Sequence, residues 1–348
     1  MVYKWIKVTK GRIVMPAGHL LSEGQYINKN VSEDELWSVF SRLFSAQSKN
    51  STSYKFAFLK SLLDNLYNVD SNLQLKFDVI FAKFAESYWN LVLKYGIRQQ
   101  SITRDGRISA IEGILREAAT RFHIADGVPF EQLNDDAMIF VCDNTKRKCK
   151  INVVGALYAD LGGMAYSFSR SGEWLRFSPY MYEFLCKHKL VIEKMNYYEW
   201  ARYMEKVNDD SMVVHLLTKI ECSTKRSDLS VYRHILYDEF ECKRCFYCGR
   251  PLKESAIHVD HFIPWSFIKD DKLWNFVLAC PQCNESKSDK LAAPVYLEQI
   301  IRRNNASRLA AYANKIAGYR SDSLRDIYNW ARTNGYSEIW EPKNQIVL

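Results

Sequence analysis

Four polar residues in the C-terminal third of the chain have the types and order expected of a hydrolytic metal site. Asp260 and His261 are adjacent, Asn275 follows Trp274, and Asn284 comes directly after a cysteine. Asp and Asn supply hard oxygen ligands suited to Mg²⁺, and a His with an ordinary pKa of about 6.5 suits a general base. This combination is typical of sites that cleave phosphodiester bonds.

Two Cys-x-x-Cys pairs flank the Asp-His pair. They are Cys245/Cys248 and Cys280/Cys283, and residues 249–279 separate them. Each spacing lets one tight turn present two sulfurs to a single ion, so the four thiolates suit a tetrahedral structural Zn²⁺. A zinc ion with four cysteine ligands has no open coordination position, so we expect it to hold the fold together while catalysis uses a separate site.

Cys242 leaves a second choice of ligands open, because Cys242 and Cys245 also form a Cys-x-x-Cys pair. We prefer Cys245 and Cys248, because Gly249 follows them as a glycine should in a metal-binding turn.

The stretch from Cys245 to Lys290 resembles the HNH endonuclease family, in which many members carry zinc-binding Cys-x-x-Cys pairs. The runs VDHFIPWSFIKDD and NESKSD are also similar to the HNH nuclease domain of RNA-guided CRISPR effectors, which lacks these cysteines. The resemblance implies a ββα-metal fold and hydrolysis of DNA.

The resemblance also implies a role for each polar residue. His261 would be the general base, Asp260 and Asn284 would hold one Mg²⁺ or Mn²⁺, and Asn275 would tie down the loop after the His. Many family members have His where this chain has Asn284. An amide oxygen in place of an imidazole nitrogen should shift the metal preference towards Mg²⁺ or Mn²⁺.

Side-chain direction places a condition on this site. Neighbouring residues of a regular strand face opposite sides, so Asp260 and His261 can share a site only where the strand ends or bulges. Pro264 is consistent with a strand that ends there.

Basic residues near the motif are candidates for contacts with DNA phosphates. Lys287 lies one helical turn after Asn284, which would place its ammonium beside the metal. Lys290, Arg302 and Arg303 would extend this patch, and His258 shares the Asp260 face of the strand. For each of them an ordinary solvated surface position is the alternative.

Composition agrees with a folded protein that binds a polyanion. The 348 residues are 47% hydrophobic, with a formal net charge of +8. We expect a cytoplasmic protein with reduced thiols, because the first residues lack an apolar signal core. The most apolar window, Ile151 to Phe168, is too short and polar to cross a bilayer, so we expect no membrane span.

Helical periodicity dominates the first two thirds of the chain. Apolar spacing predicts helices over Ser53–Tyr67, Phe77–Tyr95 with Gly96 after it, Arg107–His123, a segment that begins at Ser178-Pro179, and Asn196–Val207. The runs AMIFVC and CKINVV, on either side of Asp143 to Lys148, predict a β-hairpin. Later residues, from Leu297 through Ile327 and Tyr328 to Trp340, also look helical, with Trp340 as an anchor.

These patterns predict an α+β protein. We expect a mainly helical body over residues 1–235, a small ββα-metal HNH domain with its four-cysteine zinc site over 236–305, and a helical extension over 306–348 that packs on the nuclease domain. A short basic run between Cys222 and Asp228 is expected to be a domain boundary or a hinge.

The leading functional hypothesis is a metal-dependent HNH endonuclease that acts on DNA in restriction or anti-phage defence. The alternatives are a homing or nicking endonuclease of a mobile element and a zinc module that binds nucleic acid without cutting it. The helical body would recognise a target, sense a trigger or mediate assembly, as a homodimer or with a partner defence protein.

Overall fold

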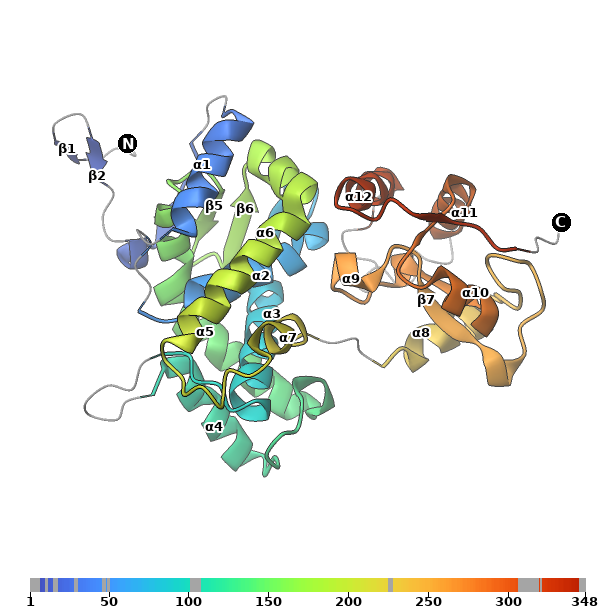
Figure 1. Cartoon of the computed structure of the whole chain (residues 1–348), viewed down its shortest axis with the longest axis horizontal. Helices are drawn as coiled ribbons and strands as arrows, with labels where there is room; N and C mark the ends of the chain where they lie inside the picture. The colour runs from blue at the N-terminus through green and yellow to red at the C-terminus, as the bar shows by residue number, and fades with distance from the viewer. Residues whose placement is uncertain are drawn as a thin grey trace. The chain divides into compact units, whose positions relative to one another are not determined.

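The computed structural model of the chain (Figure 1) describes most of the 348 residues. The described ranges are 7–9, 12–14, 18–27, 31–45, 48, 51–100, 108–224, 228–305, 319 and 321–343. The predicted helix start at Arg107 and the part of the C-terminal extension over 306–318 lie outside these ranges.

Backbone contacts divide the chain into two units. The first contains Met1–Leu185 and Lys189–Lys225, and the second contains Cys186–His188 and Arg226–Leu348. The division at Lys225 falls within the segment where the sequence suggested a hinge.

The N-terminal unit consists mainly of helices. Its α-helices are α1 Glu33–Leu43, α2 Tyr54–Asp64, α3 Phe77–Trp89, α4 Ala110–Arg121, α5 Asp135–Asp160, α6 Pro179–Glu205 and α7 Leu216–Glu221. Side-chain caps fix several starts: Ser32 and Glu35 form a capping box on α1, and Ser109 and Asn134 accept backbone N–H groups of α4 and α5. Short 3-10 and π turns in this unit are η1 Gly18–Leu20, η2 Leu66–Asn68, η3 Asn90–Lys94 and η4 Phe130–Gln132.

A small antiparallel sheet completes this unit, in the order β3-β5-β6-β4. Its strands are β3 Glu23–Gly24, β5 Tyr166–Ser169, β6 Trp174–Phe177 and β4 Gln74–Lys76. A separate short hairpin pairs β1 Lys7–Thr9 with β2 Arg12–Val14.

Aromatic side chains at helical spacing along α3 form part of the core. Phe77, Phe81, Phe84 and Tyr88 are all fully buried, and each ring contacts the next. The predicted helix is therefore confirmed, although its last turn, η3, widens to a π turn, and Gly96 follows with a left-handed φ of +69°.

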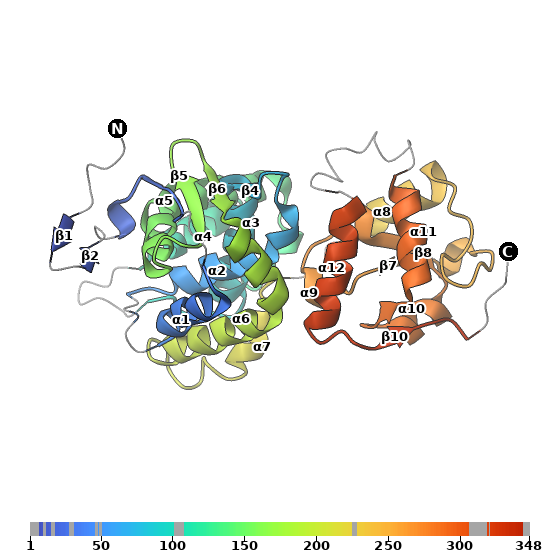
Figure 2. The same cartoon turned by 90° about the horizontal axis from the view of Figure 1, so that it is seen from above.

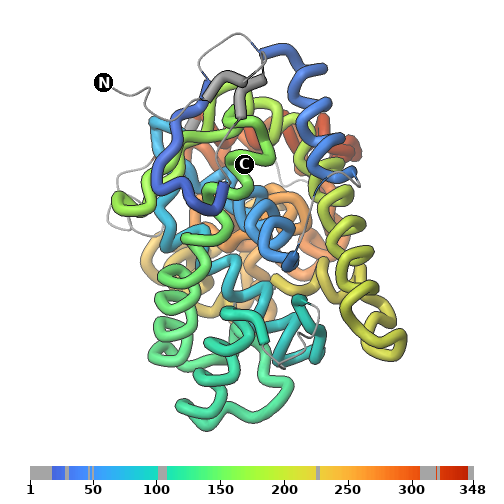
Figure 3. The backbone as a smooth tube through the Cα atoms, turned by 90° about the vertical axis from the view of Figure 1, so that its left-hand side faces the viewer, coloured from blue at the N-terminus to red at the C-terminus, as the bar shows by residue number. Residues whose placement is uncertain are grey.

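The predicted hairpin within residues 137–154 is wrong. The segment is part of α5, a single long helix that packs against α2, α3 and α4 and appears in green in Figure 3. Its buried residues Ala137, Val141, Thr145, Cys149 and Val153 recur at every fourth position. This i, i+4 stripe decides the conformation, and the polar residues from Asp143 to Lys148 continue the helix where a turn was expected.

Helix α6 begins as predicted, with Ser178 at the N-cap and Pro179 in the first turn. A kink at His188 divides α6 into two helical stretches, and the helix predicted over Asn196–Val207 lies in the second stretch, which ends at Glu205. One residue inside α6, His188, departs from helical geometry with φ −116° and ψ 18°.

The C-terminal unit carries the two Cys pairs. Its helices and turns are α8 Ser230–His234, η5 Ile235–Glu239, η6 Glu254–Ala256, α9 Trp265–Ile268, η7 Leu273–Asn275, α10 Pro281–Lys287, α11 Pro294–Asn304 and α12 Ser321–Thr333. Its strands are β7 His258–His261, β8 Phe276–Ala279, β9 Leu291–Ala292 and β10 Ile339–Trp340. Helices α11 and α12 lie side by side (Figure 2), joined by an ion pair between Glu298 and Arg325.

Antiparallel β7 and β8 are followed by α10, which gives the order of a ββα unit, with His261 opposite Phe276 at one end of the pair. The α+β fold class is confirmed. No helix within the described ranges is long and apolar enough to span a membrane.

A buried ion pair in the N-terminal unit gives a test of its packing. Lys60 and Asp64 of α2 are fully buried and 2.5 Å apart. Lys60→Met would leave the Asp64 charge buried without its partner, which should lower the free energy of unfolding by about 3–5 kcal/mol. Urea denaturation of the full chain, followed by tryptophan fluorescence, measures the loss.

Lys194→Met is the matched control, because Lys194 pairs with Glu221 at a largely exposed position. That substitution should lower the free energy of unfolding by less than about 1 kcal/mol. Equal losses in the two variants would contradict the assignment of Lys60 as a buried structural cation.

Candidate active site and zinc centre

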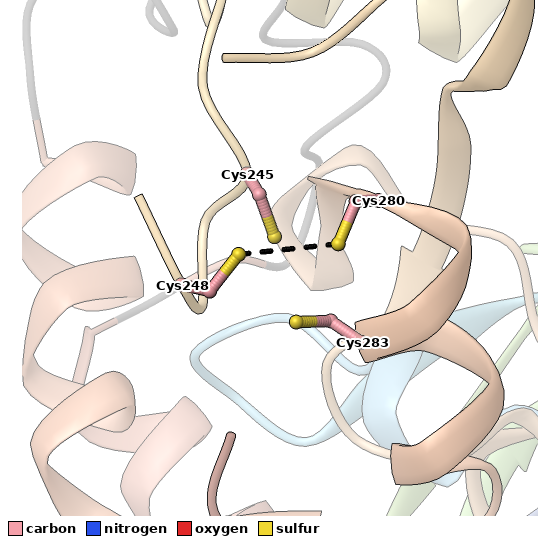
Figure 4. Close-up of side chains that lie close together, drawn as sticks. All are labelled: Cys245, Cys248, Cys280 and Cys283. Atoms are coloured by element: carbon pink, nitrogen blue, oxygen red, sulfur yellow. Dashed lines mark hydrogen bonds between the residues drawn. The ribbon is translucent and has the colours of Figure 1, made fainter. Parts of the chain in front are cut away.

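Four cysteine sulfurs converge on one point (Figure 4). The Sγ atoms of Cys245, Cys248, Cys280 and Cys283 all lie within 4.8 Å of one another, and those of Cys248 and Cys280 are 3.9 Å apart. Tetrahedral coordination with Zn–S bonds of about 2.3 Å places sulfurs about 3.8 Å apart. The cluster therefore fits Zn²⁺ in both donor type and spacing.

Local backbone geometry explains how each pair is presented. In the turn over residues 245–249, here called the knuckle, the Gly249 N–H donates to the Cys245 carbonyl at 2.9 Å, and Gly249 has a φ of +72°. A left-handed φ is readily accessible to glycine. At the other pair, Cys280 is the N-cap of α10 and Cys283 lies in its first turn.

Burial and contacts among the thiols shift the pKa values of three of the four cysteines. Burial raises the pKa of Cys245 to about 11, and burial together with neighbouring thiols raises the pKa of Cys283 further. Burial also acts to raise the pKa of Cys248, but hydrogen bonds, first from the Arg250 backbone, outweigh it and lower that pKa. A bound Zn²⁺ would remove the repulsion among the four thiolates.

Cys242 lies outside this cluster. Its sulfur contacts the Phe240 carbonyl at 3.8 Å, and burial raises its pKa. The choice of Cys245 and Cys248 over Cys242 therefore agrees with the geometry.

Strand β7 ends at His261, and Asn275 fixes the chain directly after it. Asn275 is fully buried; its amide Nδ2 donates to the Ile263 carbonyl and its Oδ1 accepts the Ile263 N–H, both at 2.8 Å. Phe262 N–H also donates to the Asn275 carbonyl at 2.7 Å. Asp260 and His261 therefore stand at the end of a strand, which is where two adjacent side chains can reach the same site.

His261 is held by a carboxylate that the motif analysis did not include. Its Nε2 lies 2.7 Å from Asp271 Oδ1, and its ring packs edge-on against Phe276 with centroids 4.7 Å apart. Both polar side chains are more than nine-tenths buried. Because a carboxylate accepts hydrogen bonds, the pair favours a proton on Nε2 and leaves Nδ1 as the proton acceptor.

Asp260 has two donors on its carboxylate. The Tyr247 hydroxyl donates to Oδ2 at 2.5 Å, and Lys287 Nζ lies 3.1 Å from Oδ2 and 3.3 Å from Oδ1. Burial, followed by the charge of Asp260, raises the pKa of Tyr247 well above its usual value, so this phenol stays protonated and donates.

Helix α10 brings Asn284 to the same face of β7. Asn284 Nδ2 lies 3.0 Å from His258 Nδ1, and one turn later Lys287 reaches Asp260. His258 and Asp260 lie on the same face of β7, because side chains two residues apart in a strand point the same way. Asn284 and Lys287 lie one turn apart on α10, so the helix contacts this strand face at two neighbouring positions. With its amide nitrogen on His258, Asn284 keeps its carbonyl oxygen available to a cation.

A comparison with protein families covers this part of the chain. Residues 245–293 match the HNH endonuclease family. The matched segment contains the four cysteines, β7, β8 and α10, and it agrees with the family named from the motif. No curated protein and no solved structure matches the chain.

The basic residues in and after the segment that matches the family differ in exposure from the expected phosphate-binding patch. The Lys287 ammonium does lie beside Asp260, but the side chain is fully buried and also donates to the His261 carbonyl at 2.8 Å. In this arrangement the donors of Lys287 face the protein, and its contact with DNA phosphate stays a prediction. His258 is likewise engaged by Asn284.

Three further basic residues follow in the chain. Lys290 and Arg302 remain on the surface, and Lys290 pairs with Glu338 at 3.3 Å. The Arg303 guanidinium binds the Phe276 carbonyl and Asn304, and burial lowers its pKa to about 10. Lys290 and Arg302 stay candidates for DNA contact, whereas Arg303 holds β8 to α11.

Two residues of the site, Asp271 and Tyr247, were not found from the sequence. Asp271 lies in the run KDD, where an acidic residue is usually an exposed loop residue. Its side-chain type was the only feature in the sequence that could have suggested a partner for His261. Tyr247 lies between two metal-binding cysteines, where an aromatic residue is usually read as packing.

Removal of one cysteine tests the zinc cluster. Cys280→Ser should lower the zinc content from one ion per chain to well below one and lower the melting temperature of the C-terminal unit, because a structural zinc contributes directly to folding. Elemental analysis by mass spectrometry and differential scanning calorimetry measure the two effects.

Cys242→Ser provides the matched control, since Cys242 lies outside the four-sulfur cluster. It should retain a full zinc ion. Loss of zinc in the Cys242 variant and retention in the Cys280 variant would reverse the ligand assignment.

Proposed function

We propose that the chain is a metal-dependent endonuclease that hydrolyses phosphodiester bonds in DNA. The observation that carries the proposal is the His261–Asp271 pair at the end of β7, directly after Asp260 in the chain, within a segment that matches the HNH family. A base with its orienting carboxylate next to two oxygen ligands is a set suited to water activation beside a phosphate.

Asp260 and Asn284 would hold one Mg²⁺ or Mn²⁺. A carboxylate and an amide oxygen are the hard donors that these ions prefer, and Mg²⁺ sites commonly use few protein ligands and keep several waters. When bound, the ion neutralises charge on the scissile phosphate and on the leaving oxygen. The fully closed thiolate cluster does not serve this purpose, because four sulfurs leave no open position.

His261 takes the proton from the attacking water at Nδ1. The water oxygen forms a bond to phosphorus, the bond from phosphorus to the 3′ oxygen breaks, and the leaving 3′ oxygen takes a proton from solvent. The products carry 5′-phosphate and 3′-hydroxyl ends. Asp271 holds the ring in the required tautomer and stabilises the imidazolium that forms. One such site cuts one strand, so a double-strand break would require two chains or two successive cuts.

The N-terminal unit is proposed to select the target in restriction or anti-phage defence. A large helical body beside a small nuclease domain supports a recognition or sensing role, since the hydrolysis itself needs only the HNH segment. A homing enzyme of a mobile element is the alternative. Cleavage of modified or phage DNA at many sites would favour defence, and cleavage at one long site would favour homing.

His261→Ala tests the proposed base. Wild-type protein with Mg²⁺ or Mn²⁺ should nick or linearise supercoiled plasmid and phage DNA, and EDTA should stop it. His261→Ala should cut at least about 100-fold more slowly, because general base catalysis contributes about 10²–10⁴-fold. Agarose gel electrophoresis over a time course gives the rates.

His234→Ala is the control, since His234 is a largely exposed residue of α8 that pairs with Asp238. It should cut at the wild-type rate. If wild-type protein binds DNA but cuts none under any of these metal conditions, the nuclease proposal is wrong and the alternative, a zinc module that binds nucleic acid without cutting it, is favoured.

Asp271→Asn tests the orienting carboxylate. An amide nitrogen facing Nε2 would favour the opposite tautomer, so we expect kcat to fall by about 10–100-fold, less than the full general base contribution because His261 remains, with little change in KM. Single-turnover cleavage of an oligonucleotide duplex separates the two parameters. An unchanged kcat would remove Asp271 from the mechanism.

A further inference from the structure

The zinc knuckle and the proposed catalytic carboxylate are joined by one side chain. Tyr247 lies between Cys245 and Cys248, and its hydroxyl donates to Asp260 Oδ2 at 2.5 Å. The residue is 4% exposed. The same short turn that presents two sulfurs to the zinc site therefore also presents a donor to the proposed ligand of the catalytic ion.

Tyr247 is itself held in place from several sides. Its ring packs edge-on against Tyr296 and Trp340, with centroids 5.4 and 5.1 Å apart. The Tyr296 hydroxyl donates to the Tyr247 carbonyl at 3.1 Å. Helix α11 and strand β10 thus fix the ring, so its hydroxyl has little freedom to leave Asp260.

The carboxylate of Asp260 has acceptor capacity beyond these two donors. An ionised carboxylate has about four acceptor positions, two on each oxygen. The Tyr247 hydroxyl donates to Oδ2, and Lys287 Nζ lies 3.1 Å from Oδ2 and donates to Oδ1 at 3.3 Å. Oδ1 therefore has fewer donors than Oδ2 and keeps the second acceptor position that a cation would use.

We propose that Tyr247 is a positioning residue that transmits the geometry of the zinc knuckle to Asp260 and thereby sets the affinity for the catalytic Mg²⁺ or Mn²⁺. The inference rests on the proposed nuclease function, because Asp260 is the ligand concerned. The four-cysteine site would then have two roles: it supports the fold, and through Tyr247 it orients the carboxylate that binds the catalytic metal. Groups that orient metal ligands in this way commonly contribute about 10–100-fold to metal affinity or activity.

Tyr247→Phe tests the inference by removing one hydroxyl and keeping the packed ring. Mn²⁺ affinity is measured by electron paramagnetic resonance in the His261→Ala background, so that a bound DNA duplex stays uncut. We expect a loss in Mn²⁺ affinity of about 10–100-fold. With His261 present, the Mn²⁺ concentration for half-maximal cleavage should rise in parallel.

Two measurements separate positioning from a general loss of structure. Zinc content should stay at one ion per chain, because all four cysteines remain. Tyr328→Phe is the matched control: Tyr328 is also a buried phenol of this unit, but it donates to the Ala292 carbonyl at 2.6 Å and not to Asp260. The control should leave Mn²⁺ affinity unchanged.

Equal Mn²⁺ affinities for Tyr247→Phe and Tyr328→Phe would overturn the inference, and so would loss of zinc in Tyr247→Phe alone. Neither result would touch the nuclease proposal, which fails only if wild-type protein does not cut DNA. A selective loss of Mn²⁺ affinity with zinc retained would establish Tyr247 as the link.

Discussion

The convergence of four sulfur atoms within 4.8 Å is the constraint on which the C-terminal unit depends. The elements that carry them are short: β7 and β8 have four residues each and α10 has seven. Elements of this length bury little apolar area by themselves, so a metal ion that ties them together would contribute directly to their stability. A zinc ion bound to two pairs from separate segments would close the loop of residues 249–279 and fix the knuckle against α10.

From these sulfurs, a continuous set of buried polar contacts leads to the proposed catalytic groups. The knuckle supplies Tyr247 to Asp260, and α10 supplies Lys287 to the same carboxylate and Asn284 to His258. A fully buried ammonium without a partner would be strongly unfavourable, so Lys287 and Asp260 depend on each other. The rigidity that a metal site needs is therefore built from groups that face the protein interior.

The motif residues were predictable because spacing and chemical type were sufficient. Two Cys-x-x-Cys pairs and an Asp-His at a strand end require no knowledge of distant contacts. The single helix α5 was missed because apolar β-branched runs on both sides of Asp143 to Lys148 suit a hairpin as well as a helix. Packing of its i, i+4 stripe against α2, α3 and α4 decided between them, and that depends on the tertiary fold.

Side-chain partners were predictable only in part. Helical spacing placed Lys287 beside Asn284 correctly, but burial decides whether an ammonium faces DNA or the protein, and spacing carries no information about burial. Asp271 reaches His261 through a loop in which Lys269 adopts a left-handed φ of 61°. A residue other than glycine at such a φ is uncommon, so the conformation that delivers Asp271 had no sequence signal.

The ends of that loop have a further consequence. Asn275 binds Ile263 through both its amide atoms, and His261 pairs with Phe276. The segment between is therefore anchored at both ends, and inside it α9 buries Phe267 and Ile268. An insertion between Ile263 and Lys269 would interrupt α9 and displace these two side chains. The length of this segment is thus set by packing as well as by the approach of Asp271 to His261.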